Sequence, residues 1–404
     1  MNGSILVFLG IYASRIGAST FQIGLLTASP AMINLLFTFP YGTMLKRVPT
    51  AKATMISVIA NRLFYLLLIP LPVLLPNSAQ VWVILAITLI MNIPGTLTAI
   101  VFNAFFAEAV PIGWRGQVVG TRNALMAVTT MATSLVVGLI LEKMPFYSGY
   151  QVVFAIGVLG AVMSAFHLWR VRLPEAPLPL RGPDPIMPQV RKDITAAARI
   201  FLRKSVFQSL RLDVFNGPFR SILVIIFLFQ IGVALINPLV PIYQVQQLTL
   251  ADLTISQGSA LFWLTNFFGS LQTRQFSHRW GFKRMTGYGL VVVTGTLVMF
   301  TFSFHNWIYL LQQFIGGIGW ALINTGLINY VLESVPVDDR ASHLAWYNLA
   351  TNAALLLCGL FAPLIAGWIG LAATLLLAAA LRLLVGVLLI GKPEKNADAP
   401  ALQL

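Results

Sequence analysis

The chain has 404 residues, of which 58% are hydrophobic and only 9% are charged. A soluble domain carries about 25% charged residues, so this composition excludes a surface that faces water on all sides and predicts a protein solvated largely by lipid. The net charge of +14 does not indicate nucleic-acid binding, because the basic residues lie in loops between apolar segments.

A bilayer-spanning helix needs about 20 mostly apolar residues. The first apolar run, residues 5–14, is a stub, and eleven full segments follow it. The full segments are 19–45, 53–75, 81–107, 117–141, 149–170, 219–244, 253–276, 286–305, 307–332, 341–367 and 370–391. The predicted fold class is therefore an all-α membrane protein with about 11–12 transmembrane helices.

Lys and Arg concentrate in alternate loops. One set of loops contains only Arg15 and Lys143. Outside the central loop, the basic residues of the other set are Lys46, Arg47, Lys52, Arg115, Arg274, Arg279, Lys283, Arg284, Arg340, Lys392 and Lys395. Since cytoplasmic loops carry the excess of positive charge, we expect the second set and both termini to be cytoplasmic. The expected location is the plasma membrane, or the inner membrane of a bacterium.

The central loop divides the chain. We expect an N-terminal six-helix half at 1–170, a cytoplasmic linker at 171–218, a C-terminal six-helix half at 219–392 and a tail at 393–404. The linker begins with the Pro-rich stretch LPEAPLPLRGPDPIMP. A basic stretch with helical periodicity follows, which predicts either an amphipathic helix on the anionic inner leaflet or an ordinary solvated tether.

An internal repeat relates the two halves. A Glu-x-Val-Pro motif, followed by an Arg and an Asn, occurs twice at an offset of 225 residues. The two copies are Glu108, Pro111, Arg115 and Asn123, and Glu333, Pro336, Arg340 and Asn348. Asn34 with Asn266 and Arg47 with Arg279 share a second offset, 232. We therefore predict parallel pseudo-repeats related by an axis along the membrane normal.

The repeat also bears on the first helix. The seventh segment begins near Arg220, and subtracting about 231 places its counterpart before residue 1. We therefore expect a first helix short by roughly a dozen residues, through a truncated fragment or a misplaced start codon. The alternative, a signal peptide over 1–15, is disfavoured because no Lys or Arg precedes the apolar stretch.

The loops after segments two and eight resemble a signature of the major facilitator superfamily, roughly Gly-x-x-x-Asp-Arg-x-Gly-Arg-Lys. The matching residues are Gly42 and Arg47 in the first copy and Arg279, Gly281 and Lys283 in the second. The acidic position is occupied by Lys46 and His278. The resemblance covers nearly the whole chain and implies a transporter that works by alternating access between its two halves.

In this family the acidic position helps to lock the cytoplasmic side. Because it is replaced here, we predict that Glu108 and Glu333 take its place. Their predicted gate partners are Arg47, Arg115, Arg279 and Arg340. Arg122, near the cytoplasmic mouth, is predicted to attract an anion or to seal the gate. The alternative is that these residues only cap helix ends and obey the positive-inside rule.

The resemblance implies that segments 1, 4, 7 and 10 line the cavity, and three of them carry polar stripes at helical spacing. The predicted substrate-binding residues are Asn92, Thr96 and Asn103 of segment 4, Gln230 and Asn237 of segment 7, and Gln313, Trp320 and Asn324 of segment 10. These amides either face a wet cavity or form hydrogen bonds between helices.

Two arginines, Arg62 and Arg382, lie deep in apolar segments. Their segments are peripheral in the family's architecture, so a structural or lipid-headgroup role is favoured over contact with solute. No Asp or Glu lies in the middle of a full segment. A buried acid usually serves proton coupling or a cationic solute. The predicted solute is therefore small and neutral or anionic.

Other functions are weaker on this sequence. No set of residues suggests an enzyme, and we expect no cofactor and no metal site. The fifth segment has a lone Gly138 where drug-exporting relatives are rich in Gly and Pro, which disfavours a drug/proton antiporter. A non-transporting sensor or a lipid-handling protein of the same fold stays open. The expected partners are a small solute and membrane lipids, with the chain acting as a monomer.

Overall fold

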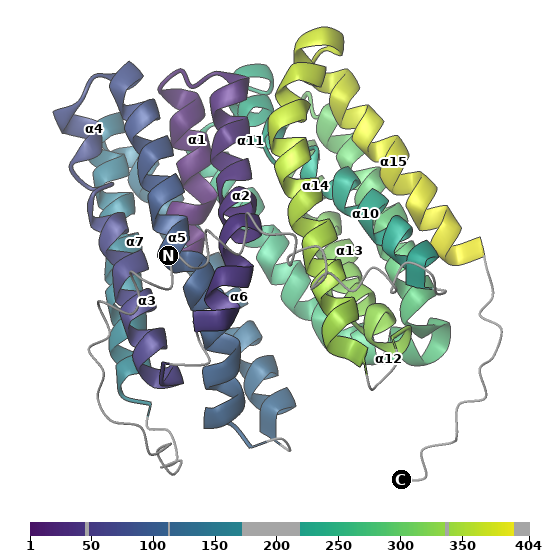
Figure 1. The fold of residues 1–404 in the computed structure, drawn as a ribbon. Coiled ribbons are helices and arrows are strands. Elements are labelled where there is room, and N and C mark those ends of the chain that lie inside the picture. The colour runs from purple at the N-terminus through teal and green to yellow at the C-terminus, as the bar shows by residue number, and fades with distance from the viewer. Residues whose placement is uncertain (45–47, 112–113, 172–218, 336–338, 392–404) are drawn as a thin grey trace.

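A computed structural model describes residues 1–44, 48–111, 114–171, 219–335 and 339–391. These ranges contain helices and no strand, which confirms the predicted fold class. Arg47, the predicted linker helix and the C-terminal tail lie outside them. The helices before residue 172 and those after residue 218 form two groups (Figure 1). The exact division into halves, linker and tail stays a prediction.

The first group begins with a π-helical turn, η1 (Asn2–Leu6), that continues into α1. Its helices are α1 (Val7–Arg15), α2 (Thr20–Met44), α3 (Thr50–Leu66), α4 (Leu71–Leu74), α5 (Asn77–Ala109), α6 (Arg115–Lys143) and α7 (Phe146–Trp169). Pro49, Pro76 and Pro145 directly precede α3, α5 and α7. Proline suits such a position because its φ is fixed and it cannot continue a preceding helix.

The second group repeats this plan with one difference. Its helices are α10 (Phe219–Ala234), α11 (Leu239–Ile242), η5 (Tyr243–Gln247), α12 (Asp252–Thr301), α13 (Asn306–Glu333), α14 (Arg340–Ile369) and α15 (Leu371–Gly391). α12 merges two predicted segments, and Gly281 marks their junction with φ +71° and ψ 161°. Glycine adopts this backbone conformation without the steric cost that a Cβ adds.

The helices are long and apolar enough for a bilayer. In the described part of the chain, nine helices meet this criterion by length and composition. The two arms of α12 account for predicted segments eight and nine. Large apolar side chains within the helices, such as Leu63 of α3 and Leu159 of α7, are exposed. Hydrocarbon, rather than water, is the solvent that such a surface fits.

The two halves meet along two helix pairs: α2 packs along α14, and α6 packs along α12. A Cβ at Gly24 would lie 2.6 Å from Pro363 Cγ, and a Cβ at Gly138 would overlap Ser256 Oγ. The sequence offsets relate these two contacts, since 256 − 24 is 232 and 363 − 138 is 225. The internal repeat therefore recurs as a pair of equivalent close contacts between the halves, which we call the seam.

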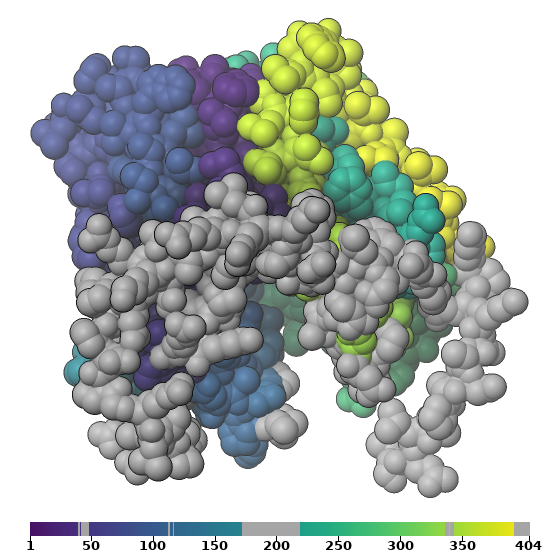
Figure 2. Space-filling model, in the orientation of Figure 1, coloured from purple at the N-terminus to yellow at the C-terminus, as the bar shows by residue number. Residues whose placement is uncertain are grey.

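The apolar core is shared at one end only. One cluster joins buried residues of both halves, including Tyr12 and Ile23 of the first and Leu239 and Ile255 of the second. A second cluster, around Phe219 and Val331, contains residues of the second half alone. In Figure 2 the halves touch in the upper part of the view, while their lower ends stand apart. We call these the Arg15 end and the Glu108 end, after residues that lie at each.

Candidate functional site

The Arg15 end is held closed by an ion pair between the two halves. Arg15, the last residue of α1, donates from Nη2 to Asp252 Oδ1 at 2.8 Å and from Nε to the same oxygen at 3.1 Å. Its Nη2 also donates to the Leu250 carbonyl at 2.6 Å. Tyr150 of α7 donates its hydroxyl to Asp252 Oδ2 at 3.1 Å. Asp252 thus accepts hydrogen bonds from two helices of the opposite half.

Farther along the seam, an asparagine of each half meets the other. Asn34 Nδ2 of α2 donates to Asn352 Oδ1 of α14 at 3.1 Å. Thr96 Oγ1 of α5 donates to Asn34 Oδ1 at 2.5 Å, and Asn352 Nδ2 donates to the Asn348 carbonyl at 2.9 Å. We call Asn34, Thr96 and Asn352 the amide clasp. It links three helices without a charged group.

Of the predicted cavity residues, four besides Thr96 form hydrogen bonds or pack between helices. Asn92 donates to the Thr88 carbonyl at 2.7 Å, and Gln230 donates to Thr351 Oγ1 at 3.0 Å. Gln313 donates to the Tyr309 hydroxyl at 2.9 Å. Trp320 packs against the core cluster of the second half. Gln230 bonds between α10 and α14, and Asn92 also donates to Ser29 Oγ of α2 at 3.5 Å, whereas the Thr88 and Tyr309 bonds stay within α5 and α13. These contacts therefore match the alternative of bonding between helices only in part.

The other three predicted cavity residues, Asn103, Asn237 and Asn324, are exposed. Amides are costly to expose to hydrocarbon. We therefore expect these three exposed amides to face a water-filled space between the halves rather than lipid. Their contact with solute remains a prediction.

The predicted gate residues lie at the Glu108 end. Glu108 Oε1 accepts a hydrogen bond from Thr50 Oγ1 at 2.8 Å, within the first half. Arg115 donates to the Val110 carbonyl at 3.0 Å and to the Ala107 carbonyl at 2.7 Å. Arg115 therefore satisfies carbonyls at the C-terminal end of α5 in this state.

The remaining gate residues are peripheral here. Arg122 is exposed and contacts the neighbouring Asn123 side chain at 3.3 Å. Arg279 is exposed just before Gly281, and Glu333 is exposed at the last position of α13. Arg340 begins α14, but its side chain is outside the described part. In this state the halves stand apart at this end, so the pairing of these residues across the halves stays a prediction.

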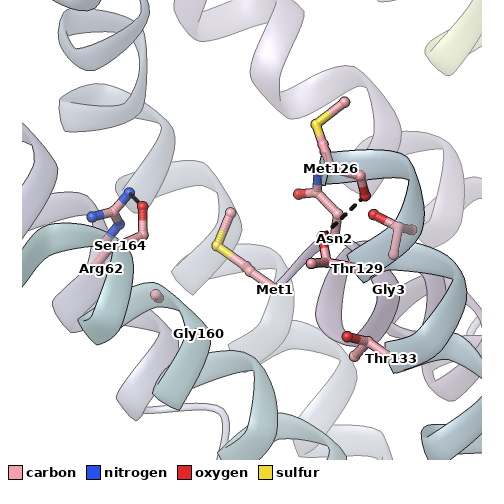
Figure 3. A pocket seen from close by; sticks show the side chains of 11 residues that line it. Met1, Asn2, Gly3, Arg62, Met126, Thr129, Thr133, Gly160 and Ser164 are labelled. Carbon is pink, nitrogen blue, oxygen red and sulfur yellow. Dashed lines mark hydrogen bonds between the residues drawn. The ribbon is translucent and has the colours of Figure 1, made fainter. Parts of the chain in front are cut away.

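A cavity of about 220 Å³ lies within the first half, between α3, α6, α7 and the first residues of the chain (Figure 3). Arg62 points into it and donates from Nη2 to Ser164 Oγ at 2.9 Å. Arg62 Nη1 is buried with no hydrogen-bond partner in the described ranges. Thr129 and Thr133 lie across the cavity from Arg62 in Figure 3, and Thr130 also lines it.

Sequence reasoning missed both bridges between the halves. Asp252 stands at the start of a predicted segment, and the loop pattern marks Arg15 only as a loop charge. Asn34 enters the sequence argument only through the repeat. A signal existed for Arg15 and Asp252, since each is an isolated charge on the side that is otherwise poor in charge. Metal ligation has no support in the described residues, which contain no group of three His, Cys, Asp or Glu side chains placed to hold a metal ion.

The fold is similar to that of solved transporters. The nucleoside transporter NupG aligns over 96% of this chain and 94% of its own, at 14% identity and a TM-score of 0.66. The xylose transporter XylE from E. coli, in an inward open conformation, aligns over 95% and 90%, at 14% identity and 0.67. A bacterial homologue of the iron transporter ferroportin, in an inward-facing state, aligns over 97% and 95%, at 12% identity and 0.68. A search of curated protein sequences found no match.

Two helical halves joined along a seam define a multi-pass membrane protein with a transporter fold. A family model described as Major Facilitator Superfamily matches residues 1–252 and 222–403. The chain belongs to this superfamily, a family of transporters, which are in general not enzymes.

Proposed function

We propose that this protein is a secondary transporter that moves a small neutral or anionic solute by alternating access between its two halves. The observation that supports this most directly is the unequal contact of the halves. They share a core and an ion pair at the Arg15 end and stand apart at the Glu108 end. Such an arrangement is one of the two end states that a rocking carrier needs.

The charge distribution supports an orientation for this state. The loops at the Glu108 end carry most of the Lys and Arg residues, so we place that end in the cytoplasm together with both termini. The state described here then opens inward. The inward-facing forms of XylE and of the ferroportin homologue are similar in fold, and we propose that the chain acts as a monomer in the plasma membrane.

The exposed amides among the predicted cavity residues, Asn103, Asn237 and Asn324, favour a neutral solute over an anionic one. Amide and hydroxyl groups supply donors and acceptors together, which suits a solute rich in hydroxyl or amide groups. Nucleosides and xylose are the solutes named for two transporters of similar fold, NupG and XylE. Both are neutral and rich in hydrogen-bonding groups, so both serve as first probes.

Uptake into proteoliposomes tests the proposal. Purified protein is reconstituted, and uptake of radiolabelled uridine, xylose, benzoate and phosphate is compared with that of protein-free liposomes. We expect saturable uptake of at least one probe, with the neutral probes favoured over the anions. Movement of fluorescent phospholipid without any solute uptake would identify a lipid-handling protein instead, and the absence of both would favour a sensor.

A cross-link at the seam gives the matched control. Ser134 Oγ of α6 and Ser259 Oγ of α12 lie 3.3 Å apart across the halves. In a Cys358→Ala background, Ser134→Cys with Ser259→Cys should form a disulfide that locks the Arg15 end. The locked protein should lose uptake, and reduction should restore it. Uptake that continues at the same rate in the cross-linked protein would exclude alternating access at this seam.

A further inference from the structure

Arg382 lies in the middle of α15 and is 4% exposed, in a helix that is otherwise apolar. We propose that Arg382 is a positioning residue that holds the interrupted helix α10–α11 and thereby sets how the Arg15 end opens. The expected effect on transport rests on the proposed function. The contact itself does not, and it is testable without a solute.

The helix after residue 219 is interrupted in its middle. α10 ends at Ala234, and α11 begins at Leu239 after a turn that contains Pro238. Proline has no backbone N–H and its ring clashes with the carbonyl four residues before it, which here belongs to Ala234. The sequence therefore imposes the break, and the break leaves carbonyl groups without their usual donors.

The turn leaves the Gly232 carbonyl without a backbone donor. The N–H of Leu235 donates to the Ile231 carbonyl at 2.9 Å, whereas the N–H of Asn237 donates to the Ala234 carbonyl at 3.2 Å. Neither bond uses the Gly232 carbonyl. A backbone carbonyl in the interior of a membrane protein needs a donor from elsewhere.

Arg382 supplies that donor. Its Nε donates to the Gly232 oxygen at 2.9 Å, and its Cγ lies 2.9 Å from the position of a Cβ at Gly232. No ion pair joins Arg382 to a carboxylate in the described part of the chain. The C-terminal end of α10 carries about half a negative charge from the helix dipole. That end, rather than an acid, provides the favourable electrostatic environment for this buried cation.

The two sides of the break belong to different parts of the molecule. Before it, α10 packs on α14 and α15, and Gln230 donates to Thr351 of α14. After it, α11 and η5 contact α1 and α2 of the opposite half, and Pro241 packs where a Cβ at Gly10 would lie. Arg382 therefore holds the helix at the break. On one side of the break α10 packs within the second half, and on the other side α11 contacts the first half at the Arg15 end.

The accessibility of the native cysteine, Cys358, provides a measure of the contact between Arg382 and Gly232. Cys358 is the only cysteine of the chain and is 4% exposed. Its Sγ lies 3.7 Å from the Ile231 carbonyl, one residue from Gly232. If Arg382 holds the break, its removal should let the end of α10 move away from α14. Cys358 should then become accessible.

The test is the rate at which N-ethylmaleimide alkylates Cys358 in the reconstituted full chain, followed by intact-protein mass. Arg382→Met keeps an unbranched apolar side chain and removes the donor. We expect alkylation to accelerate by about fivefold or more, because the Gly232 carbonyl loses its partner. Arg382→Lys keeps a charged donor and should stay within about twofold of the wild-type rate.

A second variant, Gly232→Ala, keeps Arg382 but changes the position of its side chain. Gly232→Ala should displace the Arg382 stem and accelerate alkylation in the same direction. Wild-type alkylation rates in both Arg382→Met and Gly232→Ala would overturn the proposal. Failure of both to reach the membrane, with Arg382→Lys accumulating normally, would show a role in assembly only and would overturn it as well.

Transport separates this proposal from the proposed function. In a chain that transports uridine or xylose, Arg382→Met should lower kcat by about fivefold with little change in KM. An unchanged kcat would mean that the contact of Arg382 with the α10–α11 break does not affect the rate of the transport cycle. If the wild-type chain transports no probe, the proposed function fails, while the alkylation rates still decide whether Arg382 holds α10.

Discussion

Arg15 and Asp252 lie 237 residues apart in the chain, and their side chains form an ion pair of 2.8 Å that joins the two halves. The Arg15 side chain is 25% exposed and that of Asp252 is 13% exposed. Water screens the pair less than it screens a surface pair. Tyr150 donates a further hydrogen bond to the Asp252 carboxylate, and the Leu250 carbonyl accepts one from the Arg15 guanidinium.

Neutralising this pair should weaken the closed state of the Arg15 end. In Asp252→Asn the charge of Arg15 stays partly buried without its partner, which costs about 1–3 kcal/mol. The Ser134–Ser259 cross-link should therefore form at least about fivefold more slowly. Exchanging the charges, Arg15→Asp with Asp252→Arg, should recover part of the rate. Glu142→Gln, which changes an exposed carboxylate at the same end, serves as the control and should leave the rate unchanged.

A side chain at Gly138 should force the seam apart. The added methyl group of Gly138→Ala would overlap Ser256 Oγ, so α6 and α12 must separate for it to fit. We expect a slower Ser134–Ser259 cross-link and lower solute uptake. Gly120→Ala on the same helix is the matched control, because a Cβ there meets nothing within 4 Å. Equal cross-linking in the two variants would contradict the close packing of α6 on α12.

The Asn34–Asn352 bond should appear as a coupling energy between the halves. In a double-mutant cycle of Asn34→Ala and Asn352→Ala, measured as thermal stability in detergent, we expect about 0.6–1.7 kcal/mol of coupling. Asn61 donates to the Met91 carbonyl inside the first half. Asn61→Ala combined with Asn352→Ala should therefore be additive. Additive behaviour of Asn34→Ala with Asn352→Ala would show that the clasp contributes no coupling.

The predicted gate at the Glu108 end calls for charge reversal. Glu108→Lys should reduce uptake by about tenfold if the carboxylate pairs with an arginine in the state closed at that end. Reversal of Arg47, Arg115, Arg279 or Arg340 to Glu should then restore part of the uptake in one combination. Thr50→Val removes only the hydrogen bond seen in this state and should have a small effect. No rescue by any reversal would leave Glu108 as a helix-end residue.

The fold was predictable because spanning helices follow from local composition. Apolar runs of bilayer length predict the segments. The Glu-x-Val-Pro motif, which occurs at Glu108 and again at Glu333, predicts the two halves. The position of the turn inside α12 was harder to predict from the sequence. A loop was expected over residues 277–285 between segments eight and nine, but the two helical arms of α12 run up to Gly281, the one residue inside α12 whose φ and ψ are not helical, and the chain turns there. Hydropathy alone does not reveal such a corner.

The site was predictable only in part, because contacts between the halves depend on positions far apart in sequence. The polar stripe of segment 4 identified Thr96, yet its partner Asn34 lies on α2, whose polar face was not considered. Arg382 was expected to have a structural or lipid-headgroup role. Its bond to Gly232 matches the structural alternative, but it depends on a helix break that was not predicted.

The shared core at the Arg15 end also makes the balance between the two end states sensitive to temperature. Opening that end exposes buried apolar side chains, such as Ile23 and Leu239, to a watery space. Exposure of apolar surface raises the heat capacity, and the hydrophobic contribution weakens on cooling. Cold should therefore favour the form that is open at the Arg15 end, and a plot of turnover against reciprocal temperature should curve rather than follow a straight line.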